Sequence, residues 1–245
     1  MIDYIEGHTL LINKPSRWTS FDVVKKIRNN LRTALQVKKI KVGNAGTLDP
    51  LADGLLIVCT GKFTKRINEF QAQEKEYTAE FTLGATTPSF DLETEVNETF
   101  AYNPITEDML KTNAESLTGN ILQTPPIYSA IKQDGKRLYE HARKGEDVKI
   151  KERMVHVSKF EIIKVEMPKV HVRIVCSKGT YIRSLAQTFG KNLNSGAYLS
   201  QLTRIRIGKF KLSQAIDIQE FIDSFSLTNN QATEHSFSIF AHFFT

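Results

Sequence analysis

The chain has 245 residues, of which 40% are hydrophobic and 24% charged, a composition typical of a globular protein with a substantial core. Its longest purely apolar run, residues 55–59, is far too short to span a membrane. The first six residues contain acids but no Lys or Arg, which argues against a secretory signal, and two cysteines exclude a disulfide framework. We therefore expect a protein of the reducing cytoplasm with no membrane partner.

Positive charge is concentrated in the first 211 residues. The chain has 33 Lys and Arg against 27 Asp and Glu, a net charge of +6. All of the basic residues lie at or before Lys211 and four acids follow it, so residues 1–211 carry a net charge of +10. This excess indicates a polyanionic partner, most simply nucleic acid, although a globular protein with a basic isoelectric point fits the composition equally well.

The first predicted elements are a strand and a helix. An apolar stretch over residues 8–14 predicts a short strand, which Pro15 ends. Thr19 is then placed to cap a helix, with Asp22 three residues further on. The apolar face of this helix is expected to comprise Phe21, Val24, Ile27 and Leu31. Its opposite face carries Lys25, Lys26, Asn29 and Arg32.

Later elements alternate without a regular rhythm. A helix is expected to begin at Thr106 and end at Gly119, and another carries an apolar stripe from Ile182 to Phe189. Further strands are expected over residues 55–60, 77–83, 128–132, 170–176 and 202–207. Because several strands alternate polar and apolar residues and no βαβ repeat is visible, we predict an α+β fold. Its central sheet should be mixed, mostly antiparallel and flanked by helices.

Motifs for several common chemistries are absent from the sequence. The glycines of residues 43–46 lack the Gly-Lys-Ser/Thr of a phosphate-binding loop. The six histidines and two cysteines show no zinc-ligand spacing, and neither a Gly-x-Ser-x-Gly elbow nor a calcium loop occurs. We therefore expect no metal, and the remaining candidate for chemistry is a carboxylate.

That carboxylate belongs to Asp49, in a glycine-punctuated loop over residues 43–54. Pro50 keeps Asp49 out of helical geometry, and a carboxylate on a loop anchored by two strands is well placed to meet a substrate. The alternative is a structural turn in which Asp49 caps backbone N–H groups. Asp53, beside Gly54, is interpreted as a turn residue.

Residues 177–185 predict the end of a strand, a turn at Gly179 and the start of a helix. The free N–H groups of a helix start attract phosphate or carboxylate, and Lys178 or Arg183 would add positive charge. An ordinary strand-to-helix turn with a solvated Arg183 is the alternative.

Tyrosines interleaved with basic residues are a third feature. Tyr77 follows Lys75, and Tyr128 and Tyr139 flank the basic segment 132–137. Aromatic faces among cations suit stacking on unpaired bases, although each tyrosine can equally be a half-buried packing residue.

Taken together, these segments resemble the TruB family of tRNA pseudouridine synthases over roughly residues 8–212. Residues 43–54 are similar to the family motif Gly-His-Thr-Gly-Thr/Ala-Leu-Asp-Pro-x-Ala-Thr/Ser-Gly. The other matching segments are 75–84, 124–130, 136–139 and 177–183, the last of them residue for residue. Several motifs in the same order are poorly explained by chance.

The resemblance implies an enzyme that isomerises uridine 55 in the T-loop of tRNA, with Asp49 as the nucleophilic carboxylate. It implies that Arg183 pairs with Asp49 and keeps it ionised, and that Tyr77 stacks on the flipped-out base and assists proton removal. The substrate-binding residues that it implies are Asn44, Tyr181, Lys178 and Leu202. It implies a monomer that needs no cofactor or obligate protein partner, and basic residues of 25–41 and 132–153 would hold the T-arm.

The chain departs from the family pattern at three places. Asn44 and Ala45 stand where the family has His-Thr, and Asp53 replaces a Thr or Ser, which adds a negative charge four residues from Asp49. Residues 86–91 lack the early aspartate usual in that loop. These departures put the mode of base flipping and the ionisation of Asp49 in question.

The domain organisation implied by the resemblance is a catalytic domain over residues 1–212 and a short C-terminal appendage over 213–245. The PUA-like RNA-binding domain of many family members would then be absent or vestigial. Two alternative functions remain: a T-arm folding chaperone, which should tolerate Asp49→Asn, and the catalytic subunit of a guide-RNA particle. The missing PUA-like domain argues against the second.

Overall fold

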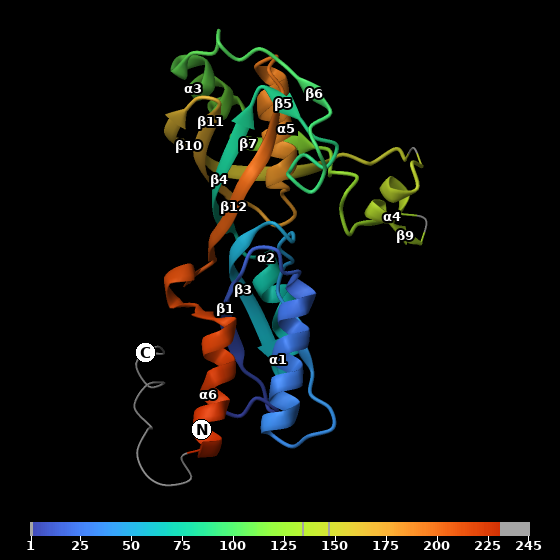
Figure 1. Ribbon diagram of the computed structural model, residues 1–245, viewed down its shortest axis with the longest axis vertical. Coiled ribbons are helices and arrows are strands. Elements are labelled where there is room, and N and C mark those ends of the chain that lie inside the picture. The colour runs from blue at the N-terminus through green and yellow to red at the C-terminus, as the bar shows by residue number, and fades with distance from the viewer. Residues whose placement is uncertain (1, 134, 147, 231–245) are drawn as a thin grey trace. The chain divides into compact units, whose positions relative to one another are not determined.

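The computed structural model describes residues 2–133, 135–146 and 148–230, which divide into two compact units. Unit 1 comprises Met1–Gln73 and Arg204–Thr245, and unit 2 comprises Glu74–Thr203. Figure 1 shows the course of the chain from blue at the N-terminus to red near the C-terminus. In the described part of the chain, no helix combines the length and the apolar character needed to cross a membrane.

Unit 1 is a small mixed sheet with helices. Its helices are α1 (Ser20–Ala34), α2 (Ile67–Ala72), α6 (Ile218–Asn230) and two 3₁₀ helices, Gly61–Arg66 and Leu212–Gln214. Its strands are β1 (Thr9–Lys14), β2 (Val42–Asn44), β3 (Asp53–Thr60), the end of β12 (Ala197–Ile207), β13 (Phe210–Lys211) and β14 (Ile216–Asp217). The strand order is β14-β1-β3-β12, with β2 on β3 and β13 on β12. β1 runs parallel to β14 and antiparallel to β3.

β3 is apolar from Leu55 to Cys59 because both of its faces are covered. Leu56 and Val58 belong to a buried cluster with side chains of α1 and α6. Leu55 and Ile57 point to the other face, where they cluster with Phe70 of α2. A strand buried on both sides loses the polar-apolar alternation of a half-buried strand, as the sequence of 55–60 indicates.

Helix α1 begins where the sequence predicts, because its capping box is formed. The Thr19 hydroxyl accepts a hydrogen bond from the Asp22 N–H at 3.0 Å, and the Asp22 carboxylate accepts one from the Thr19 N–H at 2.9 Å. These bonds satisfy two of the backbone donors at the helix start. The Thr19 hydroxyl also donates to the Asp22 carboxylate at 2.5 Å, and this bond, together with the one from the Thr19 N–H, lowers the pKa of the Asp22 carboxyl.

The predicted apolar face of α1 is wrong at one position. The side chains that enter the core are Val23, Val24, Ile27 and Leu31. Phe21 is 62% exposed and lies outside that cluster. At 100° per residue, the register that buries the other four turns Phe21 away from the core, toward the side of Lys25 and Arg32.

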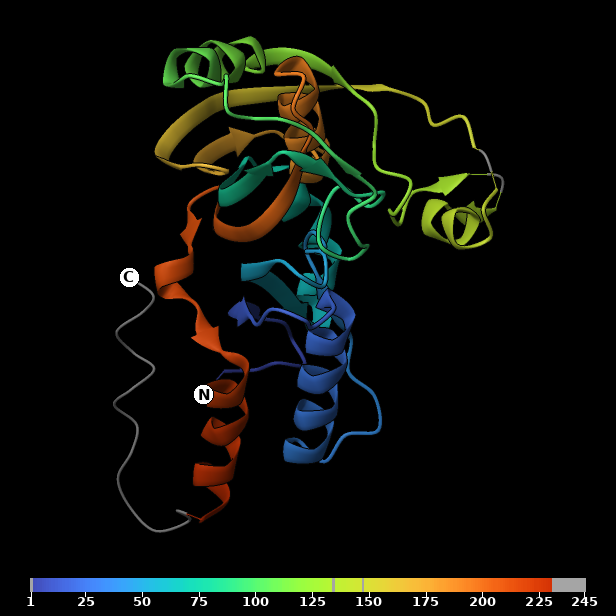
Figure 2. The same ribbon diagram turned by 45° about the horizontal axis from the view of Figure 1, so that its top comes forward.

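Helix α6 lies alongside α1 in unit 1 (Figures 1 and 2). Phe221 of α6 is 2% exposed, and its ring centroid lies 6.3 Å from that of Tyr4. Phe225 lies 5.7 Å from Tyr4 and 5.2 Å from Phe221. Part of the segment expected as an appendage is therefore packed into this unit. The division at residue 212 stays a prediction, and residues 231–245 lie outside the described residues.

Unit 2 is an antiparallel sheet with helices and two short hairpins. Its helices are α3 (Glu107–Ser116), α4 (Leu138–Arg143) and α5 (Ile182–Asn192). Its strands are β4 (Lys75–Leu83), β5 (Ala85–Thr86), β6 (Glu98–Thr99), β7 (Gly119–Gln123), β8 (Lys132–Gln133), β9 (Lys136–Arg137), β10 (Arg153–Glu166), β11 (Lys169–Cys176) and the start of β12. The main sheet has the order β12-β4-β11-β10-β7, and β5-β6 and β8-β9 pair separately.

α3 and α5 pack against this sheet, as Figure 2 shows. Phe189 of α5 lies 5.7 Å from Phe81 of β4 and 5.6 Å from Phe160 of β10, measured between ring centroids. The Asn113 side chain of α3 donates a hydrogen bond to the Phe189 carbonyl at 2.8 Å, which links the two helices. The predicted α+β fold with a mostly antiparallel sheet flanked by helices is confirmed.

One predicted strand is wrong, and two strands of the main sheet of unit 2 were not predicted. Of the expected strand over 128–132, only Lys132 pairs, in the hairpin of β8 and β9. The preceding Pro125 and Pro126 have no N–H group to donate to a sheet. β7 and β10 escaped the sequence analysis because exposed residues interrupt their apolar pattern.

We predict that Phe221→Ala will lower the free energy of unfolding by about 3–5 kcal/mol, because it removes a buried aromatic side chain from the core. Phe21→Ala is the matched control, and its effect should stay within about 0.5 kcal/mol, because the ring is exposed. Chemical denaturation of both variants measures these changes. Equal losses in the two variants would contradict the packing of α6.

Candidate active site

The Asp49 loop, residues 43–54, connects β2 to β3 within unit 1. The Ala45 N–H donates to the Ile57 carbonyl at 2.8 Å, and the Ala52 N–H donates to the Asp49 carbonyl at 3.1 Å. These bonds start and close a turn that leaves the half-buried Asp49 on the loop. Asn44, the last residue of β2, is also half-buried and pairs with Val58.

The start of α1 braces the same loop. The Ser20 hydroxyl accepts a hydrogen bond from the Leu48 N–H at 2.9 Å and donates to the Leu48 carbonyl at 3.2 Å. The Arg17 N–H donates to the Pro50 carbonyl at 2.7 Å, with Arg17 in the left-handed region at a φ of 68°. Both backbone neighbours of Asp49 are therefore held by residues 17–20.

Lys14, the last residue of β1, adds a buried positive charge beneath the loop. Its side chain is fully buried, and Nζ donates to the carbonyls of Pro15 at 2.9 Å, Trp18 at 2.5 Å and Pro50 at 3.3 Å. All three donors of the ammonium group are thus used. Burial lowers the pKa of Lys14 to about 8, while the charges of Asp53 and Asp49 act in the opposite direction.

This placement explains how the chain accommodates a negative charge at residue 53. Among the acids, the charge of Asp53 raises the pKa of Lys14 most, and the charge of Asp49 raises it second most. The additional charge therefore has a nearby counter-charge in Lys14. Lys14 was not singled out from the sequence, although a lysine at the end of an apolar strand, directly before proline, is a signal that could have drawn attention to it.

Arg204 is a second buried cation that holds the loop. It is 1% exposed, and it donates from Nε to the Leu55 carbonyl at 2.8 Å and from Nη2 to the Gly46 carbonyl at 3.0 Å. Gly46 lies at the start of the turn and Leu55 just after it, so one guanidinium spans both ends of the loop. Sequence analysis missed this residue as well.

In unit 2, Arg183 is the most strongly fixed of the predicted site residues. It is 2% exposed, and Nε lies 3.5 Å from the Asp91 carboxylate, itself buried. Its Nη1 donates to the Ser89 carbonyl at 3.3 Å, and Nη2 donates to the Tyr128 carbonyl at 3.1 Å. The solvated arginine of the alternative interpretation is therefore wrong. A pairing of Arg183 with Asp49 would join the two units and stays a prediction.

Asp91 is the functional candidate that sequence analysis undervalued. The loop after β4 lacks the usual early aspartate, yet Asp91 at its end supplies a carboxylate to Arg183. The Thr87 hydroxyl donates to the Asp91 carbonyl at 2.6 Å and the Ser89 hydroxyl at 3.1 Å. The loop is thus folded back so that Asp91 meets Arg183.

The turn before α5 is fixed by side chains from β7 and β10. Gln123 accepts a hydrogen bond from the Tyr181 N–H at 2.8 Å and donates to the Tyr181 carbonyl at 3.0 Å. The Arg153 guanidinium lies 4.7 Å from the centroid of the Tyr181 ring and donates to the Gly179 carbonyl. Lys178 is exposed beside them.

Tyr77 and Leu202 lie on β4 and β12, which are neighbouring strands in the sheet of unit 2. Each side chain is 8% exposed. Both positions are consistent with packing residues as well as with the walls of a binding site. Their assigned roles stay predictions.

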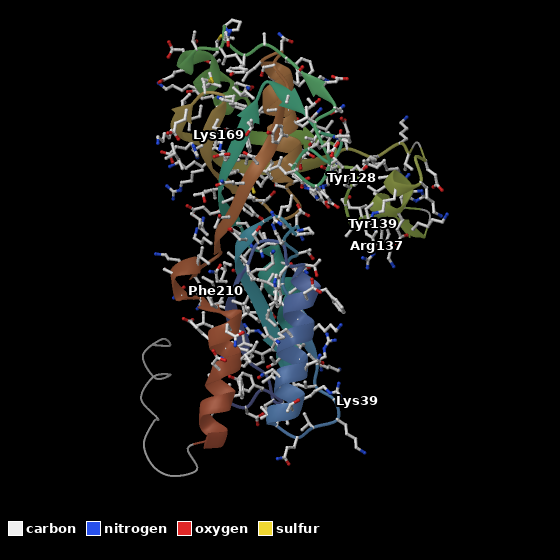
Figure 3. All side chains as sticks on the ribbon, viewed as in Figure 1. Lys39, Tyr128, Arg137, Tyr139, Lys169 and Phe210 are labelled. Carbon is white, nitrogen blue, oxygen red and sulfur yellow. The ribbon has the colours of Figure 1, made fainter. Side chains whose placement is uncertain are left out.

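The basic segment around α4 also carries a tyrosine between arginines. The guanidinium groups of Arg137 and Arg143 lie 5.8 Å and 5.4 Å from the centroid of the Tyr139 ring. Figure 3 labels Arg137 and Tyr139 close to each other in this segment. The expectation that aromatic side chains of this segment stack on unpaired bases stays a prediction.

Comparison with known proteins identifies the family. A model of the TruB family pseudouridylate synthase N-terminal domain matches residues 32–182. The chain belongs to the TruB family. As a TruB-family chain it is a pseudouridine synthase, an isomerase, as the sequence motifs predicted.

Relatives of this TruB-family chain match over nearly their whole length. It is 52% identical over 223 residues to a tRNA pseudouridine synthase B of Flavobacterium johnsoniae, which covers 91% of this chain and 97% of that protein. It is 50% identical over 220 residues to the protein of the same name from Phocaeicola vulgatus, covering 90% and 94%. A crystal structure of a Cbf5–Nop10–Gar1 complex matches with a TM-score of 0.71 and 27% identity, covering 94% of this chain and 58% of that chain.

We predict that Lys14 makes the stability of the protein depend on pH in the alkaline range. Because its folded-state pKa of about 8 lies below the ordinary 10.5, the unfolded chain binds more protons between these values. The contribution of Lys14 to the free energy of unfolding should therefore rise from pH 8 to 10.5, by up to about 3 kcal/mol. The difference in unfolding free energy between wild type and Lys14→Met, measured across this range, reports that contribution. Parallel curves would contradict the lowered pKa.

We predict that Asp91→Asn will lower the free energy of unfolding by about 3 kcal/mol, because it removes the counter-charge of a buried guanidinium. Glu6→Gln breaks the exposed ion pair with Lys62 and is the control. It should leave the denaturation midpoint unchanged, because exposed pairs contribute little. If Asp91→Asn is as stable as wild type, Asp91 is not required to balance Arg183.

Proposed function

We propose that this chain converts uridine 55 in the T-loop of tRNA to pseudouridine, with Asp49 as the nucleophilic carboxylate. The observation that carries the proposal is the braced Asp49 loop, in which the backbone on both sides of a half-buried carboxylate is fixed by hydrogen bonds from unit 1. A reacting group held in this way needs little reorganisation when substrate binds. The two relatives named tRNA pseudouridine synthase B support tRNA as the substrate.

The reaction needs an ionised carboxylate and no redox step. The N1–C1′ bond of uridine breaks, the uracil turns, and a C5–C1′ bond forms. The proton on C5 is then lost and N1 ends protonated, so the atoms balance without a co-reactant. Asp49 can start the sequence by attack on C1′, by attack on C6, or by removing a proton from C2′. The nearby Lys14 ammonium favours the charged form of Asp49 electrostatically.

The remaining site residues keep the roles that the family resemblance gives them. In the proposal, Tyr77 stacks on the flipped uracil and assists removal of the C5 proton. Arg183 supplies positive charge, and its bonds to Asp91 and two carbonyls support this role by fixing its orientation. The substrate-binding residues are Asn44, Lys178, Tyr181 and Leu202. We further propose that the chain acts as a monomer in the cytoplasm.

We predict that Asp49→Asn will lower turnover by about four orders of magnitude, because an amide is neither the nucleophile nor the base that the reaction needs. The assay follows tritium release from C5-labelled uracil in an unmodified tRNA transcript, and primer extension after carbodiimide treatment maps the product. Asp53→Asn is the matched control, because it makes the same change four residues away in the same loop. Its turnover should stay within about tenfold of wild type.

The outcomes separate the candidate functions. Release by wild type and Asp53→Asn alone, with one stop in the T-loop, supports the synthase and the role of Asp49. Equal release by Asp49→Asn would exclude Asp49 as the reacting group. Tight T-arm binding without release from any variant would instead favour the folding chaperone.

A further inference from the structure

Phe21 is an aromatic side chain that the fold of unit 1 does not use. It is 62% exposed in the first turn of α1, while the other large apolar residues of that helix face the core. Trp18, one residue before the cap, packs against the same core, so the apolar contact at the helix start is already made. An exposed Phe in this position leaves a free ring face toward solvent.

Arg17 is an exposed arginine held in an unfavourable backbone conformation. Its φ of 68° lies in the left-handed region, which costs little for glycine and more for any residue with a Cβ. The backbone bond from Arg17 to Pro50 needs only an N–H group, which glycine also has. The side chain at this position therefore serves something other than the turn itself.

Both residues stand directly beside the reacting loop. Phe21 follows Ser20, whose hydroxyl is bonded to both backbone groups of Leu48. The Arg17 N–H is bonded to Pro50. Leu48 and Pro50 are the two chain neighbours of Asp49. Phe21 and Arg17 are thus fixed to the loop on either side of the carboxylate, within unit 1.

The surroundings select an anionic, aromatic ligand. Phe21 shares its side of α1 with Lys25, one turn further on, and with Arg32 near the end of the helix, both exposed, and the loop after the helix adds Lys38, Lys39 and Lys41. Figure 3 labels Lys39 beside the lower part of this helix, on the loop that follows it. Asp22 is the acid of this helix, and its carboxylate is occupied by the Thr19 cap. An exposed ring followed by cations along the same side of the helix suits an unpaired base attached to a phosphate backbone.

We propose that Phe21 and Arg17 form an RNA contact beside the Asp49 loop. The Phe21 ring stacks on an unpaired base next to the target uridine, and the Arg17 guanidinium binds the phosphate of the same stretch. This contact rests on the proposed function for the identity of the RNA. It holds the loop nucleotides in register with the carboxylate, so these two are positioning residues.

The experiment measures affinity by fluorescence anisotropy for a T-arm hairpin and for a set of hairpins that are each abasic at one loop nucleotide other than the target. Phe21→Ala should weaken binding of the parent hairpin about tenfold, in the range found for loss of one stacked base. For one abasic hairpin, the same substitution should change affinity less than about twofold, because the stacking partner is already gone. Phe21→Tyr should restore binding, and Phe21→Leu should not.

Arg17→Gly tests the second residue, with a stability readout that distinguishes contact from structure. It should reduce the slope of log affinity against log salt by about 1, because one phosphate contact is lost. Its unfolding midpoint should equal or exceed that of wild type, because glycine relieves the backbone strain.

The control for Arg17 is Lys62→Ala, an exposed cation of the same unit, and the control for Phe21 is Ile163→Ala, an exposed apolar residue of β10. Both controls should bind like wild type.

Several results would overturn the proposal. If Phe21→Ala binds every hairpin like wild type while wild type releases tritium, the contact is wrong and the function stands. If Phe21→Ala weakens binding equally for all abasic hairpins, stacking is excluded. Loss of self-association with unchanged RNA affinity would assign the ring to a protein contact. If the substitution weakens hairpin binding but wild type releases no tritium, the contact stands and the proposed function fails. If wild type binds no hairpin, both fail.

Discussion

The Lys14 ammonium group donates hydrogen bonds to the carbonyls of Pro15, Trp18 and Pro50, so one buried charge links the end of β1, the start of α1 and the Asp49 loop. Removing an ammonium group from water is costly, and burial accordingly lowers the pKa of Lys14. Three charge-assisted bonds and two nearby carboxylates offset that cost. The loop is therefore held in the conformation that satisfies the buried charge, and other conformations would leave the ammonium unpaired.

The same device recurs at the two ends of the Asp49 loop and in a loop of unit 2. Arg204 bonds the carbonyls of Gly46 and Leu55, and Arg183 bonds those of Ser89 and Tyr128. Segments outside helices and sheets have no regular ladder to pair their carbonyls, so buried side-chain donors take over this role. Because the guanidinium group is planar with fixed donor directions, it also fixes the geometry between the segments it joins. A reaction that depends on a positioned carboxylate requires the loop that carries it to be rigid, because the reacting atoms must be held in the correct geometry.

The sequence predicted what depends on neighbouring residues. The capping box of Thr19 and Asp22 and the doubly buried β3 follow from local pattern, and both are present in the structure. The contacts of Lys14 with Pro50 and of Arg204 with Gly46 join residues 36 and 158 positions apart, and no local period indicates them. Asp91 is a similar case, because its meeting with Arg183 depends on how a whole loop folds back. Family motifs mark the residues proposed to react, whereas the residues that hold them are visible only in three dimensions.

Three departures from ordinary sequence rules in unit 1 lie within residues 14–21, and the buried Arg204 is a further one. A lysine is fully buried, an arginine adopts a positive φ, and a phenylalanine on a helix faces solvent. Each of these is unfavourable for folding on its own, and the rest of α1 follows its capping and burial pattern without exception of this kind. Local rules are broken in natural proteins mainly where function demands it, because selection for stability alone would remove such choices. Lys14 and Arg17 both donate hydrogen bonds to the carbonyl of Pro50, the residue after Asp49. Phe21 follows Ser20, whose hydroxyl is bonded to Leu48, the residue before Asp49. That three such choices adjoin the Asp49 loop supports the proposal that this loop meets the substrate.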